Sequence, residues 1–406
     1  MDFHQERVTT IHDFCIDTEK LGKRLHELKD KRRASIVLPI LYGEVENPAL
    51  KNIVEQLNKC DYLHKVIIPL AADDNDQYKK VLDFFKQLKI PNLIIWCNGP
   101  RSQAIMSNMI EHGIDVASFN GKGRDVWIAL GVASLDSYGI ALNDGDIINY
   151  TSDFPTKLLY PIIEPKLDYH FNKGYYARVS LDNKTMHGRV YRLFVQPLLD
   201  ALREDVDCNH NDILDYFKAF RYTLSGEFAM TENFALNIRI PADWGLEVGI
   251  LAEAYRNSAI KRICQTDMGF YDHKHQKMGG NYSEGLCKMA GDIFTALMRV
   301  ITETTATQIT PYFLHSLKIK YKYRAQDIIS KYSTDAICND LHFSRDEEER
   351  YVEMFSKTIM IKGRKYVENP TDMLLPNWVR TLSAMPDLRE QFYDAAVEDA
   401  KEWSNK

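Results

Sequence analysis

Short apolar runs alternate with helical stretches between residue 34 and residue 150. The apolar runs are rich in β-branched side chains and lie at residues 34–41, 64–71, 91–97 and 138–142. The stretches between them carry apolar residues at helical spacing and lie at residues 47–60, 75–89, 101–113 and 123–135. Buried strands that alternate with helices in this way predict β-α-β units and a parallel sheet covered on both faces.

Polar residues follow each predicted strand and are the first candidates for chemistry. In open α/β sheets, ligands bind beyond the carboxyl ends of the strands. The residues at these positions are Tyr42, Gly43 and Glu44, then Asp73 and Asp74, Asn98 and Gly99, and finally Asp144, Gly145 and Asp146. The sequence therefore predicts a ligand site at this edge of the sheet.

The pattern changes twice later in the chain. From about Thr151 it becomes a mixture of strands and turns, and we expect strands at 175–181, 187–194 and 234–240. After Ser283 the pattern is mainly helical, and 376–403 suits packing or self-association. We therefore expect four parts, which are an N-terminal segment with a helix at 1–33, an α/β half at 34–150, an α+β half at 151–282 and a helical region at 283–406.

Composition and charge exclude several classes of protein. The formal net charge of −6 argues against a general nucleic-acid binder, which usually shows a basic excess. The basic segment 19–33 interleaves its charges with leucines, so we expect a solvated amphipathic helix there. The seven cysteines show no C-x-x-C spacing, which favours reduced thiols in a cytoplasmic protein. Because no apolar run reaches about 18 residues and segment 1–14 lacks an apolar core, we expect neither a membrane span nor a secretory signal.

Asp144 and Asp146 form the clearest candidate site. Two carboxylates at the carboxyl end of a strand can bind a hard divalent cation, which in turn holds a diphosphate. Gly145 between them allows the backbone to turn and a ligand to approach closely. The alternative is a polar turn that closes a buried strand. The position after the fourth predicted strand favours the metal.

Segment 120–127, NGKGRDVW, opens a predicted helix with two glycines. Free N–H groups at a helix start, together with Lys122 and Arg124, can receive a phosphate. The spacing matches neither a P-loop nor a dinucleotide-binding fingerprint, so a plain turn is the alternative. Its place one helix before Asp144 suits a group that neutralises the same diphosphate.

Two further pairs of residues have both a functional and a structural interpretation. His273 and His275 are two residues apart, so on a strand both would point to one face. One could complete a metal site and the other could contact an anionic substrate, or both could be solvated loop residues. Glu227 and Glu247 each stand close to glycine and could bind sugar hydroxyls. Glutamates at helix N-termini, where they favour the helix dipole, are the alternative.

Several segments, taken together in their order along the chain, resemble those of the glucosyl-3-phosphoglycerate synthase family. These enzymes are retaining glycosyltransferases of GT-A fold, and related members are mannosyl-3-phosphoglycerate synthases. The ordered combination is specific, although each segment alone is not, and the resemblance spans residues 1–280. The segments are DFHQERVTTIHDF (2–14), SIVLPIL (35–41), NGKGRDVW (120–127), NDGDI (143–147), HGRVYRLFVQPLL (187–199), LSGEFAM (224–230), WGLEVGIL (244–251) and MGFYDHKH (268–275).

The resemblance implies a fold and an activity. The fold is a Rossmann-like GT-A sheet with a nucleotide-sugar-binding half at 34–150, an acceptor-binding half at 151–282 and a helical C-terminal extension. The activity is transfer of glucose from a nucleotide donor, UDP-glucose, to the 2-hydroxyl of 3-phosphoglycerate with retention. The product is a precursor of the compatible solute glucosylglycerate. The resemblance also implies a homodimer and a requirement for Mg2+, with Mn2+ or Co2+ as alternatives.

The resemblance further implies roles for individual residues. The metal ligands would be Asp144, Asp146 and His273. The donor would contact Pro39, Leu41, Glu44, Lys122, Asp144, Gly145 and Glu247. The acceptor would contact Gly188, Arg189, Gly226 and His275, the last at a position where the family carries asparagine. The catalytic residues would be Asp144, Asp146 and Glu247. Two alternatives stay open, namely use of GDP-mannose by the same fold and a non-catalytic nucleotide-sugar-binding protein.

Overall fold

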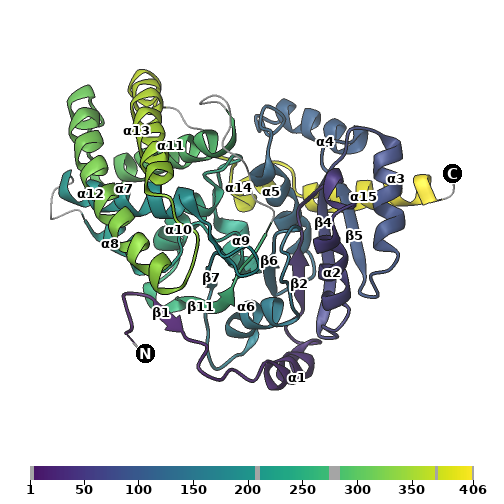
Figure 1. Ribbon diagram of the computed structural model, residues 1–406. Helices are drawn as coiled ribbons and strands as arrows, with labels where there is room; N and C mark the ends of the chain where they lie inside the picture. Colours follow the sequence, from purple (N-terminus) through teal and green to yellow (C-terminus); the bar gives the residue numbers. More distant parts are fainter. Residues whose placement is uncertain (1–3, 206–210, 274–283, 371–373, 405–406) are drawn as a thin grey trace.

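The computed structural model describes residues 4–205, 211–273, 284–370 and 374–404 (Figure 1). Nine of the described strands form one sheet in the order β1-β11-β7-β10-β6-β2-β4-β3, with β5 paired to β4. Their bounds are β1 (Thr9–Ile11), β2 (Ala34–Val37), β3 (Ile40–Leu41), β4 (Leu63–Ala71), β5 (Asn92–Trp96), β6 (Gly139–Leu142), β7 (Phe171–Ala177), β10 (Phe228–Thr231) and β11 (Ile263–Phe270). The short strands β8 (Val179–Ser180) and β9 (Thr185–Met186) form a separate hairpin.

The first half of the sheet confirms the alternation predicted from the sequence. Strands β2, β4, β5 and β6 pair in parallel. Ile67 of β4 joins the core with α4 and α5, whereas Val66 and Ile68 join the core with α2 and α3. Helices therefore cover both faces of the sheet. These helices are α2 (Pro48–Leu57), α3 (Asn75–Phe85), α4 (Pro100–Glu111) and α5 (Lys122–Ala133).

The same sheet continues into the second half. Strand β10 runs antiparallel between β6 and β7, and β11 pairs in parallel with both β7 and β1. One sheet therefore passes through both predicted halves. The helices of this half are α6 (Asp153–Ile163), α7 (Gln196–Asp205), α8 (Asp212–Ala219), α9 (Glu232–Asn237) and α10 (Leu246–Asn257).

Two of the strands predicted in this half are wrong. Segment 187–194 enters a π-helical turn, η2 (Tyr191–Val195), which continues into α7. Segment 234–240 lies in α9 as far as Asn237, and the Thr231 side chain caps this helix. Both segments are short apolar runs, and periodicity alone does not separate such a strand from a buried helix. The third predicted strand, 175–181, is confirmed by β7 and β8.

The N-terminal segment contributes a strand that the sequence did not predict. Strand β1 pairs Thr9 with Cys264 at the edge of the sheet. Three residues are too few for an alternating pattern to be recognised. The amphipathic helix predicted in this segment is confirmed as α1 (Thr18–Leu28), which buries Leu25 and Leu28 and packs on α6.

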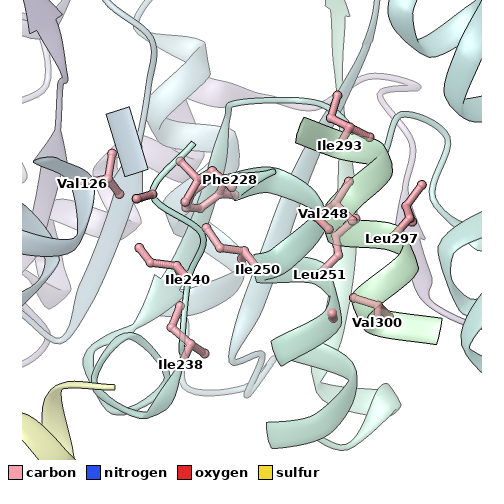
Figure 2. Close-up of a cluster of buried hydrophobic side chains, with 14 of the residues drawn as sticks. Val126, Phe228, Ile238, Ile240, Val248, Ile250, Leu251, Ile293, Leu297 and Val300 are labelled. Carbon is pink, nitrogen blue, oxygen red and sulfur yellow. The ribbon is translucent and has the colours of Figure 1, made fainter. Parts of the chain in front are cut away.

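The C-terminal region is helical, as predicted. Helices α12 and α13 lie together at one end of the molecule, whereas α15 reaches the opposite end beside α3 (Figure 1). Helix α11 packs on α10, where Val248 and Leu251 meet Leu297 and Val300 (Figure 2). Of packing and self-association, the two roles expected for 376–403, the contacts of α15 with α4, α5 and β5 show packing. The helices of this region are α11 (Gly285–Thr305), α12 (Pro311–Cys338), α13 (Arg345–Glu368), α14 (Trp378–Ala384) and α15 (Leu388–Ser404).

Among the helices that the structure describes, we find none with the length and apolar character to cross a membrane.

Two tryptophans join the C-terminal region to the first half. The ring of Trp378 stacks on that of Trp127 in α5, with centroids 4.1 Å apart and planes 14° apart. Trp378 Nε1 donates to Trp127 O at 2.9 Å, and Trp127 Nε1 donates to Pro376 O at 2.7 Å. Because Trp378 is only 1% exposed, this contact is a buried anchor between α14 and α5.

Replacing Trp378 with alanine should lower the free energy of unfolding by about 3–5 kcal/mol, since it empties a large buried site. Urea titration followed by circular dichroism measures the loss. Trp403→Ala is the matched control, because Trp403 is a partly exposed tryptophan in α15, and its loss should be clearly smaller. Equal losses for the two variants would contradict the role of Trp378 as an anchor.

Candidate active site

A cavity of about 930 Å³ opens at the carboxyl ends of β2, β4 and β6. Every described residue to which the resemblance assigned a role lines it. These residues are Pro39, Leu41, Glu44, Lys122, Asp144, Gly145, Asp146, Gly188, Arg189, Gly226, Glu247 and His273. The remaining candidate, His275, lies outside the described residues. Positions from both predicted halves therefore meet at one edge of the sheet.

The turn that carries Asp144 and Asp146 packs closely on the chain beneath it. A Cβ atom on Gly145 would lie 2.7 Å from Ile40 Cγ2 and 3.2 Å from Pro39 O. A side chain at this position would therefore push the turn away from the segment after β2. Glycine here keeps the two carboxylates at the rim of the predicted donor site.

Lys122 lies between two carboxylates at the start of α5. Its Nζ is 2.6 Å from Asp144 Oδ1 and 3.6 Å from Glu247 Oε1. Burial opposes the charge of Lys122, but Asp144 and Glu247 outweigh burial and raise the pKa of Lys122 above its ordinary value. Lys122 likewise outweighs burial at Asp144 and lowers the pKa of that carboxyl. Lys122 and Asp144 therefore stay charged, and the ammonium links α5, the turn after β6 and the first turn of α10.

The pKa of Asp146 is shifted in the opposite direction to that of Asp144. Burial, followed by the negative charges of Asp144 and Glu44, raises the pKa of Asp146 to about 7. Carboxylates that crowd together in this way resist ionisation until a cation approaches them. The cavity therefore contains a region of concentrated acidic groups next to a lysine.

The backbone brings His273 to the same turn. His273 forms an isolated β-bridge with Ile147, directly after Asp146. Its Nε2 contacts Arg178 Nη2, and Arg178 Nη1 donates to Tyr222 OH at 3.1 Å. Arg178 lines the cavity although no sequence motif singled it out, because its position depends on the end of β7 beside β11.

The donor set around the turn fits a divalent cation chemically. Carboxylate oxygens, here from Asp144 and Asp146, are the ligands that hard cations prefer, and the ring nitrogen of His273 suits first-row transition metals. Within the described residues, no three carboxylate, cysteine or histidine side chains gather as a metal-binding group. Asp144 is instead directed to Lys122, and His273 to Arg178. Metal binding by these residues would have to replace these two contacts.

Glu227 is a fully buried carboxylate beside the cavity. It accepts hydrogen bonds from Tyr176 OH at 2.7 Å and from Tyr271 OH at 2.9 Å, and the two rings stack with centroids 3.9 Å apart. Burial and then the charge of Asp144 raise the pKa of Glu227 to about 7. The helix N-terminal interpretation is therefore wrong for Glu227, whereas Glu247 does lie in the first turn of α10.

Some cavity residues were not predicted, and one predicted pair lies elsewhere. Helix α11 contributes side chains to the lining, although no functional motif was assigned beyond residue 280. Their spacing is that of any amphipathic helix, so no local signal could have revealed them. Asp73 and Asp74 are absent from the described lining, and Asp74 instead caps α3 by accepting from Gln77 N at 2.8 Å. The lining residues from α11 are Leu286, Lys288, Met289 and Ile293.

Two curated relatives match this chain over nearly its whole length. Glucosyl-3-phosphoglycerate synthase of Methanococcoides burtonii is 57% identical over 406 residues, which is 100% of both chains. Glucosyl-3-phosphoglycerate synthase of Persephonella marina is 38% identical over 404 residues, which is 98% of both chains. No protein-family model matches the chain.

Solved structures share the fold at lower identity. Glucosyl-3-phosphoglycerate synthase of Mycobacterium tuberculosis, solved with Mn2+, UDP-glucose and phosphoglyceric acid, is 19% identical with a TM-score of 0.53, and the match covers 75% of this chain and 89% of that one. Mannosyl-3-phosphoglycerate synthase of Rubrobacter xylanophilus is 19% identical with a TM-score of 0.55, and the match covers 74% of this chain and 83% of that one.

The sheet and the cavity at its carboxyl edge thus define a GT-A glycosyltransferase, and the chain is a hexosyltransferase of this class. It belongs to the glucosyl-3-phosphoglycerate synthase family.

Replacing Gly226 with alanine should lower kcat/KM by about 100-fold while the fold is kept. A Cβ atom at this position would lie 2.6 Å from Asp144 Oδ2, so the carboxylate and its partner Lys122 must move. Displacements of about 1 Å in an active site cost a loss of this size. Steady-state kinetics measures the change, with each substrate varied while the other is saturating.

Gly22→Ala is the matched control for this variant. Gly22 lies within α1, and a Cβ atom there would meet nothing within 4 Å. Activity should stay at the unmodified level. Near-normal activity of Gly226→Ala would contradict the importance of its contact with Asp144.

Proposed function

We propose that this chain transfers glucose from UDP-glucose to the 2-hydroxyl of 3-phosphoglycerate with retention of configuration. The observation that carries the proposal is 57% identity to the Methanococcoides burtonii glucosyl-3-phosphoglycerate synthase over the whole of both chains. The product, glucosyl-3-phosphoglycerate, leads to the compatible solute glucosylglycerate. The cavity supports this reaction because residues suited to a donor, a metal and an acidic acceptor line it together.

The donor is assigned to the β2–β6 side of the cavity. Pro39, Leu41 and Glu44 follow β2 and would contact the nucleoside. Lys122 would bind the diphosphate, where its ammonium stabilises the negative charge that develops on the leaving UDP. Glu247, held 3.6 Å from Lys122, would orient the hydroxyls of the donor sugar.

The metal is assigned to the turn after β6. Asp144, Asp146 and His273 would hold Mg2+, with Mn2+ or Co2+ as alternatives. A bound cation of this kind neutralises charge on the leaving diphosphate. Support comes from the acidic crowding at Asp146 and from relatives solved with Mn2+ or Mg2+ beside UDP.

The acceptor is assigned to the segment after β9. The guanidinium of Arg189 matches the geometry of both phosphate and carboxylate, and 3-phosphoglycerate carries both groups. Gly188 beside it lines the cavity and has φ of +73°, a backbone conformation that favours glycine. Gly226 lies across the cavity beside Asp144. The acceptor role of His275 stays a prediction, as do the cytoplasmic location and the homodimer.

A panel of UDP- and GDP-sugars with 3-phosphoglycerate should give product with UDP-glucose as the preferred donor. Addition of EDTA should abolish turnover, and Mg2+, Mn2+ or Co2+ should restore it. Product detection by mass spectrometry measures both effects. Preference for GDP-mannose would overturn the donor assignment, and donor binding without turnover on any sugar would favour a non-catalytic protein.

Asp146→Ala and His273→Ala should each reduce turnover by about 100- to 1,000-fold, the typical loss when one electrostatic contact to a transition state is removed. Metal binding, measured by titration calorimetry in the presence of UDP, should weaken in parallel. Asp73→Ala is the control, because Asp73 is an exposed carboxylate outside the described lining of the cavity. Near-normal turnover and metal binding in either site variant would show that the metal assignment is wrong.

A further inference from the structure

The segment assigned to the acceptor is held by two neighbouring helices of the C-terminal region. Glu348 and Tyr351 stand three residues apart in α13, so they lie on one face of this helix. Both face the segment 187–195, which contains Arg189 and the π-helical turn η2. Both side chains are buried, with exposed fractions of 7% and 4%.

Tyr351 contacts the guanidinium of Arg189 directly. Arg189 Nη1 donates to Tyr351 OH at 2.8 Å, and Arg189 Cζ lies 5.0 Å from the centroid of the tyrosine ring. The phenol is thus within reach of both a hydrogen bond and a cation–π contact. Arg189 lines the cavity, so the buried tyrosine fixes a side chain that a ligand can reach.

Glu348 fixes the backbone just before Arg189. Arg192 forms a two-pronged ion pair with Glu348, with Nη1 to Oε2 at 2.6 Å and Nη2 to Oε1 at 2.9 Å. Arg192 Nε also donates to His187 O at 3.0 Å. Since Arg192 is only 4% exposed, this paired guanidinium is a rigid connection from α13 to the residue that precedes Gly188.

Further contacts hold the chain on both sides of this point. Upstream, His342 N donates to Lys184 O at 2.7 Å, and Lys184 Nζ pairs with Asp340. Downstream, Tyr321 OH of α12 donates to Leu193 O at 2.7 Å within the π-helical turn. The hairpin of α12 and α13 therefore contacts and holds the chain from the β8–β9 hairpin to α7.

We propose that the α12–α13 hairpin is a positioning element of the acceptor site, with Tyr351 and Glu348 as positioning residues that hold Arg189 ready for an anionic acceptor. The inference rests on the acceptor role proposed above for Arg189. A free arginine side chain loses considerable rotamer entropy when it binds. Holding the guanidinium in place before binding reduces this loss and so tightens acceptor binding.

Tyr351→Phe in the full chain tests the proposal, because it removes only the hydroxyl and leaves the ring in place. The KM for 3-phosphoglycerate should rise about 3- to 10-fold, the effect of one lost hydrogen bond. The KM for UDP-glucose and the melting temperature should stay unchanged. Tyr366→Phe is the matched control, because Tyr366 lies in the same helix but donates to Thr302 Oγ1 at 3.2 Å, and it should leave both KM values unchanged.

Arg189→Ala and the double variant separate the proposal from the assignment on which it rests. Arg189→Ala should raise the KM for 3-phosphoglycerate by more than about 10-fold. Adding Tyr351→Phe to Arg189→Ala should change this value by less than about twofold, because the two residues act through one contact. An unchanged KM in Arg189→Ala would overturn the acceptor assignment itself. A raised KM in Arg189→Ala together with an unchanged KM in Tyr351→Phe, or with full additivity in the double variant, would overturn the positioning role alone.

Discussion

The ammonium of Lys122 is the contact on which the rest of the site depends. It lies 2.6 Å from Asp144 and 3.6 Å from Glu247, and the three residues come from α5, the turn after β6 and α10. A buried charge costs several kcal/mol unless it is paired, and removing one partner leaves the others uncompensated. The lysine therefore fixes how these elements meet, and it places a cation where a sugar diphosphate would lie.

Asp146 and Glu227 are carboxyl groups whose ionisation is opposed by the same buried surroundings. Burial and the charge of Asp144 raise the pKa of each carboxyl to about 7, since the cavity already contains more acid than Lys122 neutralises. A metal ion and a diphosphate bring positive and negative charge together. Under the proposed function, Lys122 would exchange a carboxylate for a phosphate while the carboxylates gain a cation, and the charges that the cation and the diphosphate bring would largely cancel.

The α/β half at 34–150 was predictable from the sequence because its local signals agree. Asn47 and Asp74 cap their helices through side-chain hydrogen bonds, and the turns after β3, β5 and β6 carry polar residues that reach the cavity. The environments of Arg178 and Glu227 were not predictable in this way. Arg178 reaches the cavity only because β7 ends beside β11. Glu227 is held by Tyr176 in β7 and by Tyr271 directly after β11, which are 51 and 44 residues away in the sequence. No pattern of neighbouring residues encodes such contacts.

Segment 187–195 shows why the half at 151–282 was harder to predict. Its apolar residues suggested a strand, yet the chain forms a π-helical turn, a conformation that is rare without support from its surroundings. That support comes from Tyr321 and Glu348, which are 128 and 156 residues away from their partners Leu193 and Arg192. Because tertiary contacts override local propensity here, the conformation of this segment depends on the C-terminal helices as much as on its own sequence. Under the acceptor role proposed for Arg189, a region without any recognisable motif would therefore be part of the active site.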